Sequence, residues 1–225
     1  KRLRDLNGFG PRSEEILAEV GIHTIEDFMS IDPYDLYGKL KPMKGFKPII
    51  NAKSKVLILG TFPSQSSLKM NQYYANATNL FWPLMHAVLE NSDNEAAAKL
   101  WNSTSSYNHK KLYVLRKGVA VWDVLRTCER RTSADRYIRY EKVYNFKRFF
   151  GKYPKIKTVV FNGGGKGKYP RTQSAAGFYH SHVGFDDDHE FITVYSSSSE
   201  DRNKLDYDSL FLKKYDDWKI IRDHL

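Results

Sequence analysis

The chain has 225 residues, of which 41% are hydrophobic and 14% aromatic, and its formal net charge is +10. This composition argues against a disordered chain, and the positive charge favours a polyanionic partner. The first 45 residues hold 7 Lys and Arg against 8 Asp and Glu, which leaves 29 against 18 for the rest, so the excess charge lies after residue 45.

Cys128 is the single cysteine, which excludes an intramolecular disulfide and a zinc site built from several cysteines. No apolar run reaches membrane-spanning length, and the first residues lack the apolar core of a signal peptide. These features predict a cytoplasmic protein with no membrane partner.

Residues 1–42 have the pattern of a small helical module. Pro11 follows a glycine turn and suits the first turn of a helix, Gly21 ends that helix, and Thr24 and Asp32 begin two more. Two short helices around a glycine turn indicate a helix-hairpin-helix, whose backbone N–H groups would face phosphates. A small packing or dimerisation module is the alternative, because helix pairs are common.

Residues 43–54 contain Gly and Pro and are predicted to be a linker to a domain over 55–225. In that domain, apolar runs typical of buried parallel strands lie at 56–60, 118–122, 158–161 and 191–195. Helices are predicted at 79–90, 112–116, 141–153 and 204–225, with a polar insertion at 91–109. This alternation predicts an α/β fold with three layers, in which a doubly wound four-stranded parallel sheet has helices on both faces.

Small, polar or basic residues follow each of these strands, as a cleft that follows phosphates requires. Such folds bind ligands at the carboxyl ends of their strands. The glycine run at 162–168 matches neither the phosphate-loop nor the dinucleotide pattern in spacing. The histidines show no metal-ligand spacing, so the sequence predicts no metal site and no cofactor.

The loop after the first strand carries the most specific pattern. It contains Leu57-Ile58-Leu59-Gly60-Thr61-Phe62-Pro63-Ser64, Ser67-Leu68, Gln72-Tyr73-Tyr74-Ala75 and Asn79-Leu80-Phe81-Trp82. Further matches are residues 118–125, Cys128, Arg130 or Arg131, Ser133, Asp135, 145–146 and 161–163. Over about residues 50–222 this order resembles the uracil-DNA glycosylase superfamily. The nearest branch includes the hypoxanthine-DNA glycosylases and, further off, the mismatch-specific uracil glycosylases. Residues 1–42 separately resemble the C-terminal domain of the competence regulator TfoX.

The resemblance implies a monofunctional enzyme that flips a uracil, hypoxanthine or modified base out of DNA and hydrolyses its N-glycosidic bond, leaving an abasic site. Many members have a catalytic Asn or Asp where this chain has Phe62. The hypoxanthine branch also has an apolar residue there, and this likeness implies that Asn79 is the catalytic residue. A cap for the helix at 81–90 is the alternative role for Asn79.

The other site residues are assigned to the base and to DNA. Asn162 is expected at the edge of the flipped base, with a turn residue as the alternative. Backbone N–H groups of Thr61 and Phe62 would hold a base carbonyl, while Phe62 or Tyr74 would stack on the ring. The expected DNA contacts are Ser64, Arg130, Arg131, Lys166, Lys168, Ser197, Ser199 and Arg202. The loop after the fourth strand, residues 196–202, is called the fourth loop and lacks the prolines usual in the branch. The residue that enters the DNA helix and the identity of the excised base therefore stay open.

The expected partner is double-stranded or single-stranded DNA, bound by a monomer. No activated lysine is evident, so hydrolysis is expected rather than an imine route. Two alternatives stay open at this point. One is a glycosylase for a bulky modified cytosine in phage DNA, and the other is a catalytically silent DNA-binding protein. A small-molecule hydrolase is disfavoured by the positive charge.

Overall fold

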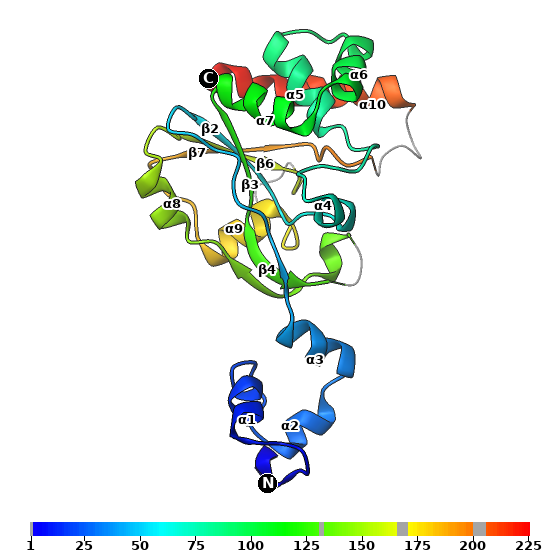
Figure 1. Cartoon of the computed structure of the whole chain (residues 1–225). Coiled ribbons are helices and arrows are strands. Elements are labelled where there is room, and N and C mark those ends of the chain that lie inside the picture. The colour runs from blue at the N-terminus through cyan, green and yellow to red at the C-terminus, as the bar shows by residue number, and fades with distance from the viewer. Residues whose placement is uncertain (1, 131–132, 166–170, 200–205) are drawn as a thin grey trace.

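The computed structural model describes residues 2–130, 133–165, 171–199 and 206–225. Its centre is a parallel sheet with the strand order β3-β2-β6-β7 (Figure 1). The strands are β2 (Val56–Gly60), β3 (Val119–Asp123), β6 (Thr158–Asn162) and β7 (Glu190–Val194). Every residue of β2 and β3 is buried, which explains their continuous apolar sequence. The predicted four-stranded parallel sheet is therefore confirmed.

Helices cover both faces of this sheet (Figure 1). One face carries α5 (Phe81–Glu90), α7 (Tyr107–Arg116) and α10 (Tyr207–Trp218), with α6 (Glu95–Thr104) packed on α5. The other carries α8 (Phe146–Lys152) and α9 (Ala175–His182), while α4 (Gln65–Met70) follows β2. A 3-10 helix, Lys219–His224, follows α10.

A second, antiparallel sheet has the order β1-β4-β5. It consists of β1 (Met43–Lys44), β4 (Leu125–Glu129) and β5 (Arg139–Val143). Ile49 also exchanges two backbone hydrogen bonds of 2.9 Å with Val121. Backbone pairing thus holds residues 43–54, the predicted linker, along the domain that follows it. The helix predicted over 141–153 is wrong in its first part, because residues 141–143 pair with β4.

The sequence predicts a polar insertion at 91–109 without helices, but the structure has helices there. Most of it forms α6 and the beginning of α7. Asn94 accepts a hydrogen bond from the Ala97 N–H at 2.9 Å, and Ser106 accepts one from the His109 N–H at 3.2 Å. These polar residues cap helices, and Ala98 is fully buried against the rest of the domain.

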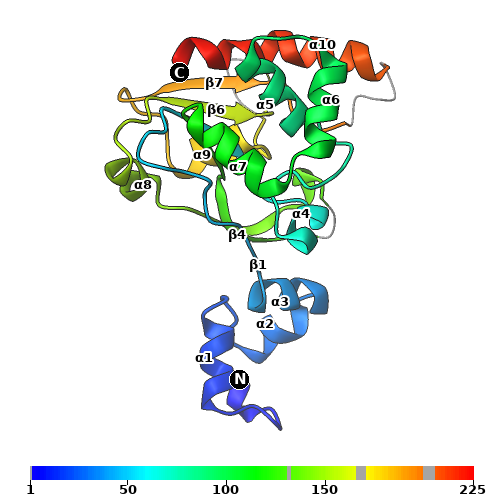
Figure 2. The same cartoon turned by 45° about the horizontal axis from the view of Figure 1, so that its top comes forward.

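The N-terminal residues form a separate helical module with a small core of its own (Figure 2). Its elements are a 3-10 turn, Leu3–Asp5, and the helices α1 (Pro11–Ala18), α2 (Ile25–Ser30) and α3 (Pro33–Leu40). Leu3, Leu17 and Ile22 are buried together. As predicted, Pro11 begins the first helix, while Thr24 and Asp32 cap the second and third.

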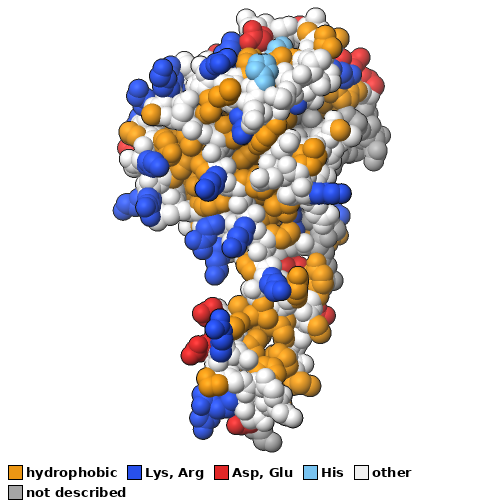
Figure 3. Space-filling view, in the orientation of Figure 1, with side chains coloured by type: hydrophobic (Ala, Val, Ile, Leu, Met, Phe, Trp, Pro, Cys, Tyr) orange, Lys and Arg blue, Asp and Glu red, His pale blue; other side chains and the backbone are white. Residues whose placement is uncertain are grey.

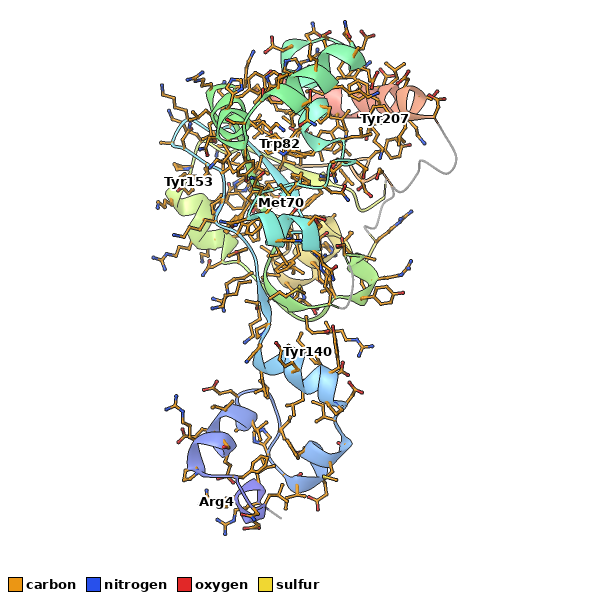
Figure 4. The ribbon with its side chains drawn as sticks, turned by 45° about the vertical axis from the view of Figure 1, so that its right-hand side comes forward. Arg4, Met70, Trp82, Tyr140, Tyr153 and Tyr207 are labelled. Carbon is orange, nitrogen blue, oxygen red and sulfur yellow. The ribbon has the colours of Figure 1, made fainter. Side chains whose placement is uncertain are left out.

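Helix α3 joins this module to the second sheet. The Arg139 guanidinium lies 3.3 Å from an Asp35 carboxylate oxygen, and the Lys39 ammonium lies 4.8 Å from the centre of the Tyr140 ring. Figure 4 shows Tyr140 beside α3. Such exposed pairs contribute little to stability. Gly38 of α3 is buried against the Glu129 side chain of β4, so the module also packs on the second sheet at this point.

None of the described helices combines the length and the apolar character that crossing a membrane requires.

Candidate active site

A cavity of about 740 Å³ opens at the carboxyl ends of the parallel strands. Its wall includes the strand-end residues Gly60, Asp123 and Asn162. Eight of the residues predicted for the site line it: Thr61, Phe62, Ser64, Tyr74, Asn79, Asn162, Ser197 and Ser199. The parallel sheet brings them together because the loops after its strands all emerge at one edge.

Asn79 lies half-buried just before α5. Its Oδ1 accepts a hydrogen bond of 2.9 Å from the Phe81 N–H, so it satisfies a free donor at the start of this helix. Asn79 thus caps the helix from the position before Leu80, the N-cap residue, which makes no side-chain cap bond itself. Oδ1 keeps a second lone pair, and the cap leaves the side-chain NH₂ group for other contacts. Capping and catalysis by Asn79 are compatible, because the cap fixes the direction of the amide.

Tyr74 adopts a left-handed backbone conformation with φ of 53°, which is costly for an aromatic residue. Two side chains hold it there. Its ring stacks on Phe81, with 3.7 Å between the ring centres, and its hydroxyl accepts a hydrogen bond of 3.1 Å from Asn162. Burial and then the nearby Asp123 raise the pKa of Tyr74, so its hydroxyl stays protonated. One face of the ring is thus covered by Phe81, and Tyr74 lines the cavity.

Asn162 connects three loops. Its Nδ2 donates to the Tyr74 hydroxyl and, at 2.9 Å, to the Ser197 hydroxyl, while its Oδ1 accepts from the Ser197 N–H at 2.8 Å. The Ser197 carbonyl in turn accepts from the Leu80 N–H, next to Asn79. Both N–H groups of the Asn162 amide are thus used within the protein, and one lone pair of Oδ1 is left for a base.

Ser197 needs a correction. It was expected to contact phosphate, but only 1% of its surface is exposed and its hydroxyl is bound to Asn162. Its role in this structure is to fix the fourth loop against Asn162 and Leu80. Ser199 is less buried, and its hydroxyl lies 2.9 Å from that of Thr78. Ser64 caps α4 by accepting a hydrogen bond from the Ser67 N–H.

Lys214 supports a loop that lines the cavity, and the sequence interpretation gave it no role. It lies on α10, is 2% exposed, and its ammonium donates to the carbonyls of Ser196 and Ser198 at 2.6 and 2.5 Å. A positive charge beneath the fourth loop therefore fixes the shape of that loop. The signal was available, because Lys214 falls on the apolar face that Leu210 and Trp218 define at helical spacing.

Arg130 also needs a correction. It was expected to bind phosphate, yet its side chain is 1% exposed. Its guanidinium donates to the carbonyls of Pro63 and Ser133 and lies 3.6 Å from an Asp135 oxygen. The Thr61 hydroxyl donates to the other Asp135 oxygen at 2.5 Å. Arg130 and Asp135 thus fix the first loop, rather than contact DNA.

Phe62 is buried beneath the same group of residues. The centre of the Arg130 guanidinium lies 5.2 Å from the centre of its ring, and 7% of the residue is exposed. The ring is thereby held in the cavity wall.

Asp123 ends β3 and is 3% exposed. Burial raises its pKa to about 8, a change that Arg130 opposes and Asp135 reinforces. The sequence interpretation gave this residue no definite role, because its burial depends on how the first loop folds over the strand end.

Basic residues lie around the mouth of the cavity. Arg136 and Arg171 line it and are exposed, and Arg126 is exposed on β4. Figure 3 shows Lys and Arg side chains spread over the visible face of the domain. The predicted DNA contacts Arg131, Lys166, Lys168 and Arg202 lie outside the described residues.

Comparison with known proteins identifies the family. The chain is 33% identical over 128 residues to a hypoxanthine DNA glycosylase from Methanosarcina acetivorans, a match that covers 56% of this chain and 74% of the relative. This chain belongs to the hypoxanthine DNA glycosylase family. A hypoxanthine DNA glycosylase from Methanosarcina barkeri is 28% identical over 135 residues, covering 60% of this chain and 80% of the relative. No protein-family model matches the chain.

The fold agrees with this family. A solution structure of a proposed uracil DNA glycosylase from Methanosarcina acetivorans superposes with a TM-score of 0.55, at 24% identity, over 78% of this chain and 97% of that one. Because its relatives at 33% and 28% identity are hypoxanthine DNA glycosylases, the chain is a DNA glycosylase, a hydrolase that acts on N-glycosyl bonds and binds DNA. The two alternatives from the sequence, a phage-DNA enzyme and a silent binding protein, gain no support over this assignment.

Proposed function

We propose that this DNA glycosylase excises hypoxanthine from DNA. The observation that carries the proposal is the relationship at 33% identity to a protein named hypoxanthine DNA glycosylase. The cavity agrees with it, because about 740 Å³ is in the range of sites that enclose a small molecule. Its polar groups gather where the strands end, as recognition of a flipped base requires.

Asn79 is the proposed water-positioning residue. Cleavage builds positive charge on the sugar and negative charge on the base, so a water held behind the sugar carbon lowers the barrier. The free lone pair of Asn79 Oδ1 would accept from that water. The Phe81 N–H fixes the amide at 2.9 Å, so the oxygen needs no reorganisation when substrate binds.

The base itself would lie between the first loop and Asn162. The remaining lone pair of Asn162 Oδ1 accepts a ring N–H, while backbone N–H groups of Thr61 and Phe62 donate to a base carbonyl. The hypoxanthine ring offers this combination of carbonyl and adjacent N–H, and so does uracil. The Tyr74 ring, or the Phe62 ring, stacks on the base.

DNA would lie across the mouth of the cavity. Arg126, Arg136 and Arg171 would contact phosphates, together with Ser64, Ser199 and the predicted residues Arg131, Lys166, Lys168 and Arg202. The N-terminal module would be a helix-hairpin-helix-like unit similar to the TfoX C-terminal domain, and it would add phosphate contacts through backbone groups. A monomer acting in the cytoplasm on the bacterial nucleoid remains the working proposal.

The test is a set of duplexes, each with one hypoxanthine, one uracil or one modified cytosine, and the same strands without a complement. Incubation followed by alkali cuts the strand wherever a base has been removed. We expect cutting at hypoxanthine well above cutting at the other bases. Preferential cutting at the modified cytosine would contradict the proposed substrate. The single strands would show which form of DNA the enzyme prefers.

A further inference from the structure

One buried carboxyl group in the cavity wall has no role in the chemistry described so far. Asp123 is 3% exposed, and within the described part of the chain its Oδ2 is buried without a hydrogen-bond partner. An ionised carboxylate in this position would lose its hydration and receive no hydrogen bond at Oδ2 in return. The neutral acid, which carries a proton, is therefore the favoured form.

The fold makes room for this group. A Cβ atom on Gly60 would lie 2.5 Å from Asp123 Oδ1 and 3.0 Å from the Tyr74 hydroxyl oxygen. Only glycine at the end of β2 leaves this space. The Asp123 carboxyl and the Tyr74 hydroxyl thus occupy one region of the cavity wall, beside the Tyr74–Phe81 stack that borders the base site.

The charged groups around Asp123 do not neutralise it. Arg130 is the cation that acts on it, but the Arg130 guanidinium is already bound to Pro63, Ser133 and Asp135. Asp135 is a second negative charge and acts in the opposite direction. The titratable groups on the other elements are Tyr73, Tyr74, Tyr107 and Tyr144, and the pKa of each is raised, so all four are uncharged.

We propose that Asp123 is the acid that donates a proton to the departing base. The inference rests on the proposed function, because the base has to lie in this cavity. The bond between the sugar carbon and the base nitrogen breaks, and its electron pair goes to the base. The Asp123 proton goes to the base as well, so the base leaves uncharged. Water forms the new bond to the sugar carbon and releases one proton to solvent, from which the Asp123 carboxylate is protonated again.

The burial of Asp123 suits this role. A proton donor contributes most when its pKa lies near the working pH, and burial moves the pKa of this carboxyl from the acidic range to about 8. The donor also strengthens its hydrogen bond as negative charge grows on the base, so it favours the transition state over bound substrate.

The experiment measures single-turnover excision from a duplex with one hypoxanthine, between pH 5.5 and pH 9.5, for the full chain. The wild-type rate should fall about tenfold per pH unit above the pKa of Asp123, because the acid form is lost. Asp123→Asn keeps a polar side chain of the same size without a proton to give. It should react about 100-fold more slowly at pH 7 and show no such fall.

The variant separates this effect from ionisation of hypoxanthine, which would persist in Asp123→Asn. Asp135→Asn is the matched control, since it removes the other carboxylate that lines the cavity. Its rate should still fall at alkaline pH, with the fall moved to lower pH because a charge that raises the Asp123 pKa is gone.

A wild-type rate that stays level to pH 9.5 would overturn the proposal even if Asp123→Asn failed to fold. A folded Asp123→Asn variant whose rate falls with the same midpoint and slope as the wild type would overturn it too. Absence of excision by the wild type at every pH would contradict the proposed function instead, and the role of Asp123 with it.

Discussion

Asn79 combines two roles in one side chain. Its oxygen caps α5 through the Phe81 N–H, and the same amide is proposed to hold the attacking water. A cap contributes about 1 kcal/mol to stability, whereas loss of one key electrostatic group costs about 100-fold or more in rate. The two roles therefore predict effects of different kind and size, which can be measured on the same samples.

We expect Asn79→Ala to lower the single-turnover rate by about 100-fold or more and leave DNA affinity almost unchanged, because phosphates supply most of the affinity. It should also lose about 1 kcal/mol of stability. Asn79→Ser is the matched control, since serine caps helices well but has no amide. It should recover the stability and not the rate. Recovery of both would leave Asn79 with the capping role alone.

Asp123 predicts an unusual dependence of stability on pH. The unfolded chain loses this proton near the ordinary pKa of aspartate, while the native state keeps it up to about pH 8. Between these values the native state binds more protons, so the free energy of unfolding falls as pH rises. Asp123→Asn removes this contribution. Urea unfolding should show that the free energy of unfolding of the variant, relative to that of the wild type, is higher at pH 8 than at pH 5 by on the order of 3 kcal/mol. An equal difference at both pH values would contradict a neutral Asp123.

At the scale of elements, the fourth loop is held from three sides. Asn162 on β6 binds Ser197, the Leu80 N–H before α5 binds its carbonyl, and Lys214 on α10 binds Ser196 and Ser198. The loop after β7 is thereby coupled to the segment that carries Asn79. Movement of the loop after β7 should therefore change the position of Asn79, and movement of Asn79 should disturb the loop.

Lys214→Met tests this coupling. It leaves two carbonyls without their donor, so we expect a loss of about 1 to 3 kcal/mol in stability and a lower excision rate in the folded variant. Lys213→Met is the control, because Lys213 is exposed on the same helix and carries the same charge. It should change neither quantity much. Equal effects of the two variants would show that charge, rather than the anchoring of the loop, matters here.

The sequence predicted the central sheet well because each of its strands is a run of apolar residues between polar loops. It predicted α6 poorly, since residues 95–104 look polar while their Ala98 face is packed on α5. It could not distinguish the buried residues Arg130 and Ser197 from exposed residues that are able to contact phosphate. Their burial arises from loops that fold over them from distant parts of the chain, and a local pattern carries no sign of this. The order of the site loops, in contrast, follows directly from the parallel topology.

At the scale of the molecule, the N-terminal module is joined to the catalytic domain by few side chains. Removal of residues 1–42 keeps β1, which pairs with β4. We therefore expect this deletion to weaken DNA affinity modestly and to leave the single-turnover rate largely intact. Loss of the chemical step in a folded deletion would show that the module forms part of the site.

The positive charge of the catalytic domain predicts binding that depends steeply on salt. If several arginines neutralise phosphates, log affinity should fall linearly with log salt concentration, and Arg171→Ala should reduce that slope by about 1. A salt response that is flat in the wild type would contradict binding through phosphates.

The central claim is that the enzyme hydrolyses the N-glycosidic bond of hypoxanthine in this cavity. Detection of the free base tests this claim most directly. Enzyme in excess over a duplex with one hypoxanthine should release one free hypoxanthine per strand, detected by mass spectrometry. The strand should stay intact until alkali is added, and Asn79→Ala should release the base about 100-fold more slowly. Release of no free base by the wild type, or a strand cut without alkali, would contradict the account.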